Sequence, residues 1–291
     1  LGFTRQAGEQ VQVRILYGGK PRVAVRAPWD GGFTWATTKA GAPWITTTCQ
    51  GEGADLWWPC KDHMYDEPDS QAITVTVPNG LMDVSNGRLR RTQENGDGTT
   101  TYEWFVSNPI NNYGVNVNIA NYTHWSEVYN GEKGPLTMDY YVLPQNLNKA
   151  KEQFKQAPMM MKALEYWFGP YPFYEDGYKL VEVPYLGMEH QSSVTYGNQY
   201  LNGYLGMDLS STGWGKKWDF IIIHESGHEW FANNGTYRDI ADMWVHESFT
   251  NYSECLYTEY HFGKDAGAEY VRGCRKQIEN KRPIVGIYNV N

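Results

Sequence analysis

The pattern of apolar and polar positions changes near residue 145. Before it, apolar residues recur at every second position in several runs: Ile73, Val75, Val77; Tyr102, Trp104, Val106; and Val115, Val117, Ile119. A period of two predicts β-strands with one packed face and one solvated face. Turn-forming sequences such as Pro78-Asn79-Gly80 separate the runs. We therefore expect an antiparallel sheet in the first half of the chain.

From about Asn146 the apolar residues follow helical spacing, beginning with Leu147, Ala150, Phe154 and Ala157. Pro158 either kinks this helix or starts a second one, because its nitrogen cannot donate a hydrogen bond inside a helix. The pattern predicts a short strand over 179–183 and helices over roughly 218–232 and 239–262. The expected fold class is α+β, with an N-terminal β domain over 1–145 packed directly on a mainly helical domain over 146–291.

Composition excludes several classes of function. Lys and Arg number 25 against 33 Asp and Glu, which gives a net charge of −8, and no run of five like charges occurs. This balance argues against nucleic acid or an anionic membrane surface as the main partner. The longest apolar stretch, 220–223, is far too short to cross a bilayer, so we expect no membrane span in this chain.

The ends and the cysteines leave the cellular compartment undecided between an exported and a cytoplasmic location. The sequence begins at Leu1 without an initiator Met and stops at Asn291, so we expect a piece of a longer protein. Cys49, Cys60, Cys255 and Cys274 form no C-x-x-C pair, which favours buried thiols. Only Cys49 and Cys60 are close enough in sequence to close a small loop by a disulfide in an oxidising compartment.

A metal-binding motif lies at 223–230, which reads I-H-E-S-G-H-E-W. His224 and His228 are four residues apart on a predicted helix, so both imidazoles leave the same face and together bind one zinc ion. Glu225 is placed to act as a general base toward a water at the metal. The alternative is an exposed helix with two surface histidines. The apolar run before His224 argues against it, because this helix enters the interior, where unpartnered polar groups are costly.

A third ligand is expected from the next helix. Glu247 follows His228 after 18 intervening residues. Its helix has an apolar part (Trp244, Val245, Phe249, Tyr252, Leu256, Tyr260) and a neighbouring polar stripe (Glu247, Asn251, Glu254, Thr258). We predict that Glu247 binds zinc and that Asn251 or Glu254 hydrogen-bonds a ligand histidine. The alternatives are a solvated stripe, or His246 as a rival ligand, although His246 points away from wherever Glu247 points.

His224, Glu225, His228 and Glu247 at this spacing resemble the gluzincin aminopeptidases, the aminopeptidase N and leukotriene hydrolase family. That family has a G-x-M-E-N motif about 35 residues before the first zinc histidine, and here the place is taken by Leu186-Gly187-Met188-Glu189-His190. The resemblance implies that Glu189 binds the free α-ammonium group of a peptide. It also implies that Gly187 and Met188 lie beside the substrate.

A second motif extends the resemblance into the first half. Trp58-Pro59-Cys60-Lys61-Asp62 is similar to the family's F-P-C-x-D signature, and Gln50 stands nine residues before Pro59, where the family places a side chain that also reaches the substrate amine. The resemblance implies an N-terminal β domain on a thermolysin-like zinc-peptidase domain. It also implies a Zn²⁺ cofactor and, as substrates, peptides with a free N-terminus.

The sequence departs from the family pattern at several positions. His190 replaces the usual Asn, Leu186 replaces the first Gly, and His246 and Ser248 flank Glu247 where the family has Asn and Gly. The family's catalytic tyrosine, which hydrogen-bonds the tetrahedral oxyanion, would fall beyond Asn291. The resemblance therefore implies a truncated catalytic domain that binds zinc but shows little or no turnover.

The predicted function is a zinc-dependent metallo-aminopeptidase that removes the N-terminal residue of peptides. One alternative is a zinc endopeptidase or an epoxide hydrolase that uses the same metal site. Another is a catalytically inactive, zinc-binding scaffold. The intact set of His224, Glu225 and His228 argues against the scaffold, because loss of Glu225 is the simplest route to an inactive relative.

Overall fold

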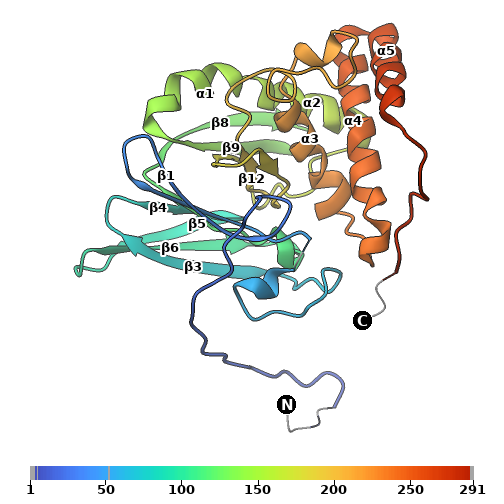
Figure 1. Cartoon of the computed structure of the whole chain (residues 1–291). Helices are drawn as coiled ribbons and strands as arrows, with labels where there is room; N and C mark the ends of the chain where they lie inside the picture. Colours follow the sequence, from blue (N-terminus) through green and yellow to red (C-terminus); the bar gives the residue numbers. More distant parts are fainter. Residues whose placement is uncertain (1–3, 5, 52, 289–291) are drawn as a thin grey trace.

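The computed structural model describes residues 4, 6–51 and 53–288, so the outer ends of the two predicted domains, Leu1 and Asn291, lie outside the described residues. A layer of antiparallel strands packs beneath a second layer, in which helices cover a mixed sheet (Figure 1). Antiparallel sheets in the first half and helices in the second confirm the α+β class.

Two antiparallel sheets form the lower layer. One has the order β1 (Gly32–Thr37), β2 (Pro43–Thr48), β7 (Asn118–Ala120) and β4 (Met82–Val84); the other has β3 (Gln71–Pro78), β6 (Thr99–Val106) and β5 (Arg88–Glu94). The alternating residues predicted for β3 and β6, including Ile73 and Trp104, pack into their shared core. Val115 and Val117 are buried as well, but they precede β7, because a 3₁₀ turn at Asn112–Gly114 delays the strand.

The upper layer contains a five-stranded sheet that draws on both halves of the sequence. Its order is β11 (Gly187–Met188), β12 (Val194–Tyr196), β10 (Tyr178–Glu182), β9 (Gly134–Val142) and β8 (Thr123–Gly131). β9 pairs in parallel with β10, with Tyr140 opposite Leu180. Residues 123–142, which belong to the first half of the sequence, are thus hydrogen-bonded into a sheet with strands of the second half. A domain boundary near residue 145 stays a prediction.

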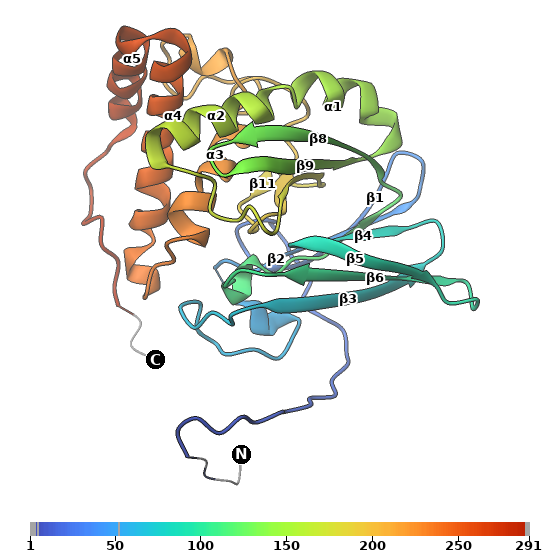
Figure 2. The ribbon, with the colours of Figure 1, turned by 180° about the vertical axis from the view of Figure 1, so that it is seen from behind.

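The described residues of the second half form five α-helices: α1 (Leu147–Gln153), α2 (Gln156–Phe168), α3 (Phe220–Gly227), α4 (Trp244–Phe262) and α5 (Lys264–Cys274). α1 and α2 lie over β8 and β9 (Figures 1 and 2). Of the two possibilities for Pro158, the second helix is correct, because Pro158 lies in the first turn of α2, where no N–H is needed. Within the described residues, no helix has the length and apolar composition needed to cross a membrane.

The two later helices start or end differently from their predicted ranges. α3 ends at Gly227 and is followed by a π-helical turn, Glu229–Asn233, instead of continuing to 232. α4 begins at Trp244, after a separate 3₁₀ turn at Ile240–Asp242. Side chains after His228 consequently leave the backbone in directions that a continuous helix would not give.

The start of α3 is anchored to the sheet through Asp219. Its carboxylate accepts hydrogen bonds from the backbone nitrogens of Ile221 and Ile222, which satisfies free donors of the first helical turn. The Tyr196 hydroxyl, on β12, donates to the other oxygen of the same carboxylate at 2.7 Å. The apolar residues 220–223 that follow are buried in the main core. α3 is thus fixed in position at the end from which the histidine motif follows.

All four cysteines carry free thiols. Cys49 and Cys255 are buried, while Cys60 and Cys274 are partly buried. Cys49 and Cys60, the one pair close enough in sequence for a small disulfide loop, are not joined.

Candidate metal centre

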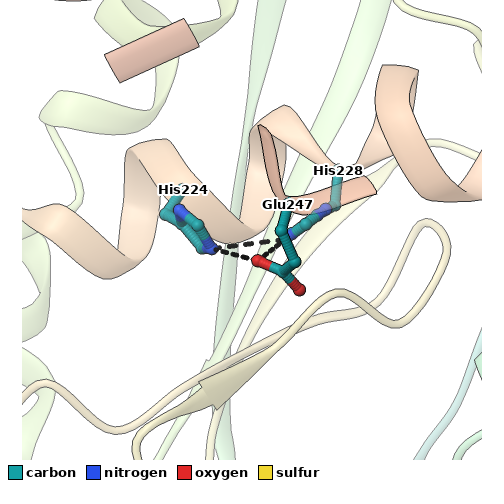
Figure 3. Close-up of side chains that lie close together, drawn as sticks. All are labelled: His224, His228 and Glu247. Atoms are coloured by element: carbon teal, nitrogen blue, oxygen red, sulfur yellow. Dashed lines mark hydrogen bonds and ion pairs between the residues drawn. The ribbon is translucent and has the colours of Figure 1, made fainter. Parts of the chain in front are cut away.

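The two motif histidines project from the same face of α3. Their Nε2 atoms are 3.3 Å apart (Figure 3). His228 is buried, and the side chain of His224 is only 14% exposed and stacks on the ring of Phe220. Two ring nitrogens therefore meet at one point at the edge of the interior.

Glu247, in the first turn of α4, brings a carboxylate to the same point (Figure 3). Its Oε2 lies 3.5 Å from His224 Nε2 and 3.7 Å from His228 Nε2. Three atoms that each lie about 2.0–2.1 Å from a tetrahedral zinc ion are about 3.4 Å apart. The three side chains therefore fit zinc. The Glu247 side chain is 46% exposed, so the site faces solvent on its open side.

Two glycines permit the close approach of backbones that this site needs. A Cβ at Gly227 would lie 2.7 Å from Ser253 Oγ, so its absence lets the end of α3 pack against α4. A Cβ at Gly187 would lie 2.7 Å from Ile221 Cγ2 and 3.2 Å from Glu225 Oε1. β11, the edge strand, therefore lies directly against the motif helix.

The second nitrogen of each histidine also has a partner. His224 Nδ1 donates to Glu254 Oε1 at 2.8 Å. His228 Nδ1 donates to the carbonyl oxygen of Phe231 at 3.1 Å and lies 3.0 Å from Thr250 Oγ1. Protons held on Nδ1 leave the Nε2 lone pairs free to bind a metal. In the π-helical turn the backbone leaves helical geometry at Phe231, and this directs the Phe231 carbonyl group toward His228.

The polar stripe predicted on α4 is buried at two of its four positions. Glu254 and Thr258 are fully buried, and Asn251 donates to Glu254 Oε1 at 3.3 Å. The Tyr270 hydroxyl, from α5, donates to Glu254 Oε2 at 2.8 Å. The alternative of a solvated stripe is therefore wrong for Glu254 and Thr258, whereas Asn251 is exposed. Some residues of the predicted apolar part are exposed, with Phe249 and Tyr252 about half exposed.

Replacing Glu254 with Gln should weaken zinc binding about 10–100-fold, the usual cost of losing an outer-shell partner of a histidine ligand. An amide accepts a weaker hydrogen bond than a carboxylate and no longer raises the basicity of His224. Titration against a chelator of known affinity measures the change. Glu259→Gln is the matched control, because Glu259 is on the same helix, about three turns beyond Glu247. Equal zinc affinities of E254Q and the unaltered protein would contradict the prediction.

Glu225 lies between the histidine site and the edge strand, and its side chain is buried. Burial raises the pKa of Glu225 to about 8; His224 opposes this shift, and the carboxylates of Glu189 and Glu247 add to it. In Glu247 burial also favours the neutral form, but His228 and His224 outweigh it and hold the pKa of Glu247 at about 2. One carboxyl group can thus exchange a proton near neutral pH, while the other stays a charged ligand.

Glu189 and Gln50 come together although they are far apart in sequence. Gln50, just after β2, donates from Nε2 to Glu189 Oε1 at 2.6 Å. Glu189, just after β11, is buried, and burial raises its pKa. One ligand atom from each of Glu189, Glu225 and His228 lies within 4.8 Å of the others. The predicted amine-binding pair is therefore next to the predicted general base and one predicted metal ligand.

Met188 and His246 have other surroundings. Met188 is buried in a small apolar cluster with Tyr113, Val183 and Tyr185, so its side chain contributes to packing. His246 Nε2 accepts a hydrogen bond from the backbone nitrogen of Tyr237 at 3.0 Å, and its ring packs against the Tyr237 ring at a tilt of 31°. His246 thus points away from the converging ligand atoms, as its position beside Glu247 predicts.

Three residues near the site were missing from the sequence prediction. Thr250 contacts His228 and lies three residues after Glu247 on α4, so helical spacing was an available signal. Asn233 Nδ2 donates to the backbone oxygen of Glu189 at 2.7 Å, and the Tyr113 hydroxyl donates to Glu189 Oε1 at 3.3 Å. These last two contacts depend on the π-helical turn and on the packing of the two halves, which no local pattern predicts.

The helices that carry these side chains match a family model. Residues 152–284 match the peptidase family M1 domain. "Probable aminopeptidase 1" of Saccharolobus solfataricus is 26% identical over 220 residues, which cover 73% of this chain and 26% of that protein. Glutamyl aminopeptidase of Homo sapiens is 25% identical over 288 residues, which cover 87% of this chain and 29% of that protein. The chain spans about a quarter of the length of these relatives. The resemblance to the gluzincin aminopeptidases is confirmed.

A solved structure shares the fold of this chain. The M1 zinc metallopeptidase from Deinococcus radiodurans aligns with a TM-score of 0.70 at 19% sequence identity, and the match covers 92% of this chain and 57% of that one. The aligned region extends well beyond residues 152–284, so the lower β layer belongs to the shared fold as well.

Proposed function

We propose that this chain forms the zinc-binding and amine-recognising part of a metallo-aminopeptidase, a protein that hydrolyses the first peptide bond of a peptide. The observation that carries the proposal is the short distance between two groups of side chains. Ligand atoms of Glu189, Glu225 and His228 lie within 4.8 Å of one another. In a peptide, the α-nitrogen and the first carbonyl carbon are only about 2.5 Å apart. An ammonium on Glu189 therefore places the first carbonyl group at the metal ligands.

The proposed metal ligands are His224, His228 and Glu247. A zinc ion bound by them supplies a Lewis acid for the scissile carbonyl and lowers the pKa of water at the site. Glu225 takes a proton from the attacking water and returns it to the leaving amine. A pKa raised to about 8 suits both steps, because the carboxyl group accepts and releases a proton near neutral pH. The Nδ1 contacts of Glu254 and Thr250 keep the two imidazoles oriented.

Glu189 and Gln50 give the proposed enzyme its preference for the chain end. A buried carboxylate forms a strong, charge-assisted hydrogen bond with an ammonium, whereas an internal peptide nitrogen carries no charge and has only one hydrogen. The Gln50 amide group donates to Glu189 through its nitrogen, so its carbonyl oxygen remains able to accept from the same ammonium. The names of the relatives, "probable aminopeptidase 1" and glutamyl aminopeptidase, support an exopeptidase over an endopeptidase or an epoxide hydrolase.

In the full-length protein, replacing Glu189 with Gln should lower kcat/KM for free-amine peptides about 10–100-fold, because the charged acceptor of the ammonium becomes a neutral amide. Initial rates on a free-amine aminoacyl reporter and on its N-acetylated form measure the effect. Glu182→Gln is the matched control, since Glu182 is also buried and accepts a 2.6 Å hydrogen bond from an amide, that of Asn146. Efficient hydrolysis of the acetylated reporter by the unaltered protein would instead indicate an endopeptidase.

A further inference from the structure

Tyr113 comes from the first half of the chain but reaches the amine site. It lies in the 3₁₀ turn Asn112–Gly114, between β6 and β7, and Asn111 Oδ1 closes this turn by accepting a 2.6 Å hydrogen bond from the backbone nitrogen of Gly114. Its side chain is fully buried and packs in the small apolar cluster with Val183, Tyr185 and Met188. The Tyr113 ring is therefore held in one position by apolar contacts and by its turn.

The hydroxyl group of Tyr113 is a hydrogen-bond donor to Glu189. It lies 3.3 Å from Glu189 Oε1, the same oxygen that accepts from Gln50 Nε2 at 2.6 Å. Burial raises the pKa of Tyr113 well above its ordinary value, and the neighbouring carboxylate of Glu189 adds to this, so the hydroxyl keeps its proton. A phenol has one hydrogen, and here it is directed at Glu189.

Three contacts together restrict the orientation of Glu189. Gln50 and Tyr113, both in the first half of the chain, donate to one carboxylate oxygen. Asn233, in the π-helical turn after His228, donates to the backbone oxygen of the same residue. Because Oε1 receives two donors, Oε2 is the oxygen left to accept from a ligand. A carboxylate held in this way loses less conformational entropy when it binds an ammonium group than a carboxylate that is free to rotate.

We propose that Tyr113 is a positioning residue of the amine site: it orients the Glu189 carboxylate for a primary ammonium group, the N-terminus of the peptide. This inference rests on the proposed aminopeptidase function. Tyr113 makes its contact through Glu189 and performs no step of the hydrolysis. Its removal is therefore expected to weaken amine binding in the ground state and the transition state alike.

The test is Tyr113→Phe in the zinc-loaded full-length protein. KM for a free-amine aminoacyl reporter should rise about tenfold, the usual effect of losing a hydrogen bond to a charged group, while kcat changes less than about threefold. Isothermal calorimetry with isoamylamine, a primary amine without a scissile bond, should show the same tenfold loss of affinity. Tyr122→Phe is the matched control, because Tyr122 is a buried tyrosine that donates to a backbone oxygen, that of Glu182, at 2.8 Å.

The two readouts separate this inference from the proposed function. Weaker isoamylamine binding and a higher KM in Y113F, with both unchanged in Y122F, support the positioning role. Unchanged amine affinity in Y113F, equal losses in both variants, a fall in kcat at constant KM, or no amine binding by the unaltered protein would each overturn it. If the zinc-loaded protein binds isoamylamine but the full-length protein does not hydrolyse free-amine peptides, the proposed function fails, and the calorimetric comparison still decides the role of Tyr113.

Discussion

In the full-length protein, replacing Glu225 with Gln should reduce kcat for free-amine peptides by about 10²–10⁴-fold, the range that general acid–base catalysis contributes. The amide has nearly the shape of the carboxyl group but cannot accept the proton of the attacking water. Zinc binding should change little, since Glu225 is absent from the set of His224, His228 and Glu247 ligand atoms. Steady-state kinetics together with metal analysis of the same samples measures both quantities.

Glu182→Gln again serves as the control for a buried glutamate outside the site. Its kcat should stay within about threefold of the unaltered protein, a difference of less than 1 kcal/mol in the activation free energy. A zinc-replete E225Q protein with undiminished kcat would assign the general base to another residue. Loss of zinc from E225Q would mean that Glu225 is a ligand and that the proposed division of roles is wrong.

Replacing Glu247 with Ala should lower zinc affinity about 10²–10³-fold. Structural zinc sites gain about 10–16 kcal/mol from about four ligands, so one ligand accounts for roughly 2.5–4 kcal/mol. The variant should also lose hydrolysis at zinc concentrations that saturate the unaltered protein. Competition with a chromophoric chelator at constant pH gives the affinity, and circular dichroism checks that α4 is still formed.

Glu259→Ala is the comparison for this substitution, because it removes the same side chain further along α4. Its zinc affinity should match that of the unaltered protein. A Glu247→Ala protein that binds zinc as tightly as before would show that the third ligand comes from elsewhere. His246→Ala would then be the next variant, although the His246 ring is engaged with Tyr237.

Local patterns predicted most of the elements. Alternation predicted β3 and β6, since residues such as Ile73 and Trp104 are buried on one side of a twisted sheet. Helical spacing predicted α2 and α4. The parallel pairing of β9 with β10 could not be predicted from the sequence pattern. The residues of one strand do not indicate which distant strand will be its neighbour. The predicted domain boundary near residue 145 therefore took no account of the five-stranded sheet, which has strands on both sides of that residue.

The metal centre was easier to predict from the sequence than the amine site, for a geometric reason. His224 and His228 are related by one helical turn, so sequence spacing alone places their side chains together. Gln50 and Glu189 are connected only by the packing of the two layers, and family resemblance, not spacing, suggested that pair. Neither sequence spacing nor family resemblance suggested Tyr113, because it contacts Glu189 from a turn 76 positions earlier in the chain.

Helix ends were the least predictable detail, and they matter for the site. The π-helical turn after His228 directs the Phe231 carbonyl and the Asn233 side chain toward the site. Apolar periodicity did not predict this change, because Trp230 and Ala232 are apolar residues that also suit a helix continuing to 232. Gly227 is the nearest sequence feature, and its role is the close contact of α3 with Ser253 on α4.

Zinc K-edge X-ray absorption of the protein loaded with one equivalent of zinc tests the central claim most directly. The claim is that two imidazoles and one carboxylate, from His224, His228 and Glu247, bind a single ion. The predicted spectrum has two nitrogen ligands with imidazole scattering at about 2.0–2.1 Å, oxygen ligands at about 2.0–2.2 Å and no sulfur. Loss of one imidazole contribution in His228→Ala would tie the signal to this site. A sulfur shell near 2.3 Å, or a spectrum that His228→Ala leaves unchanged, would contradict the claim.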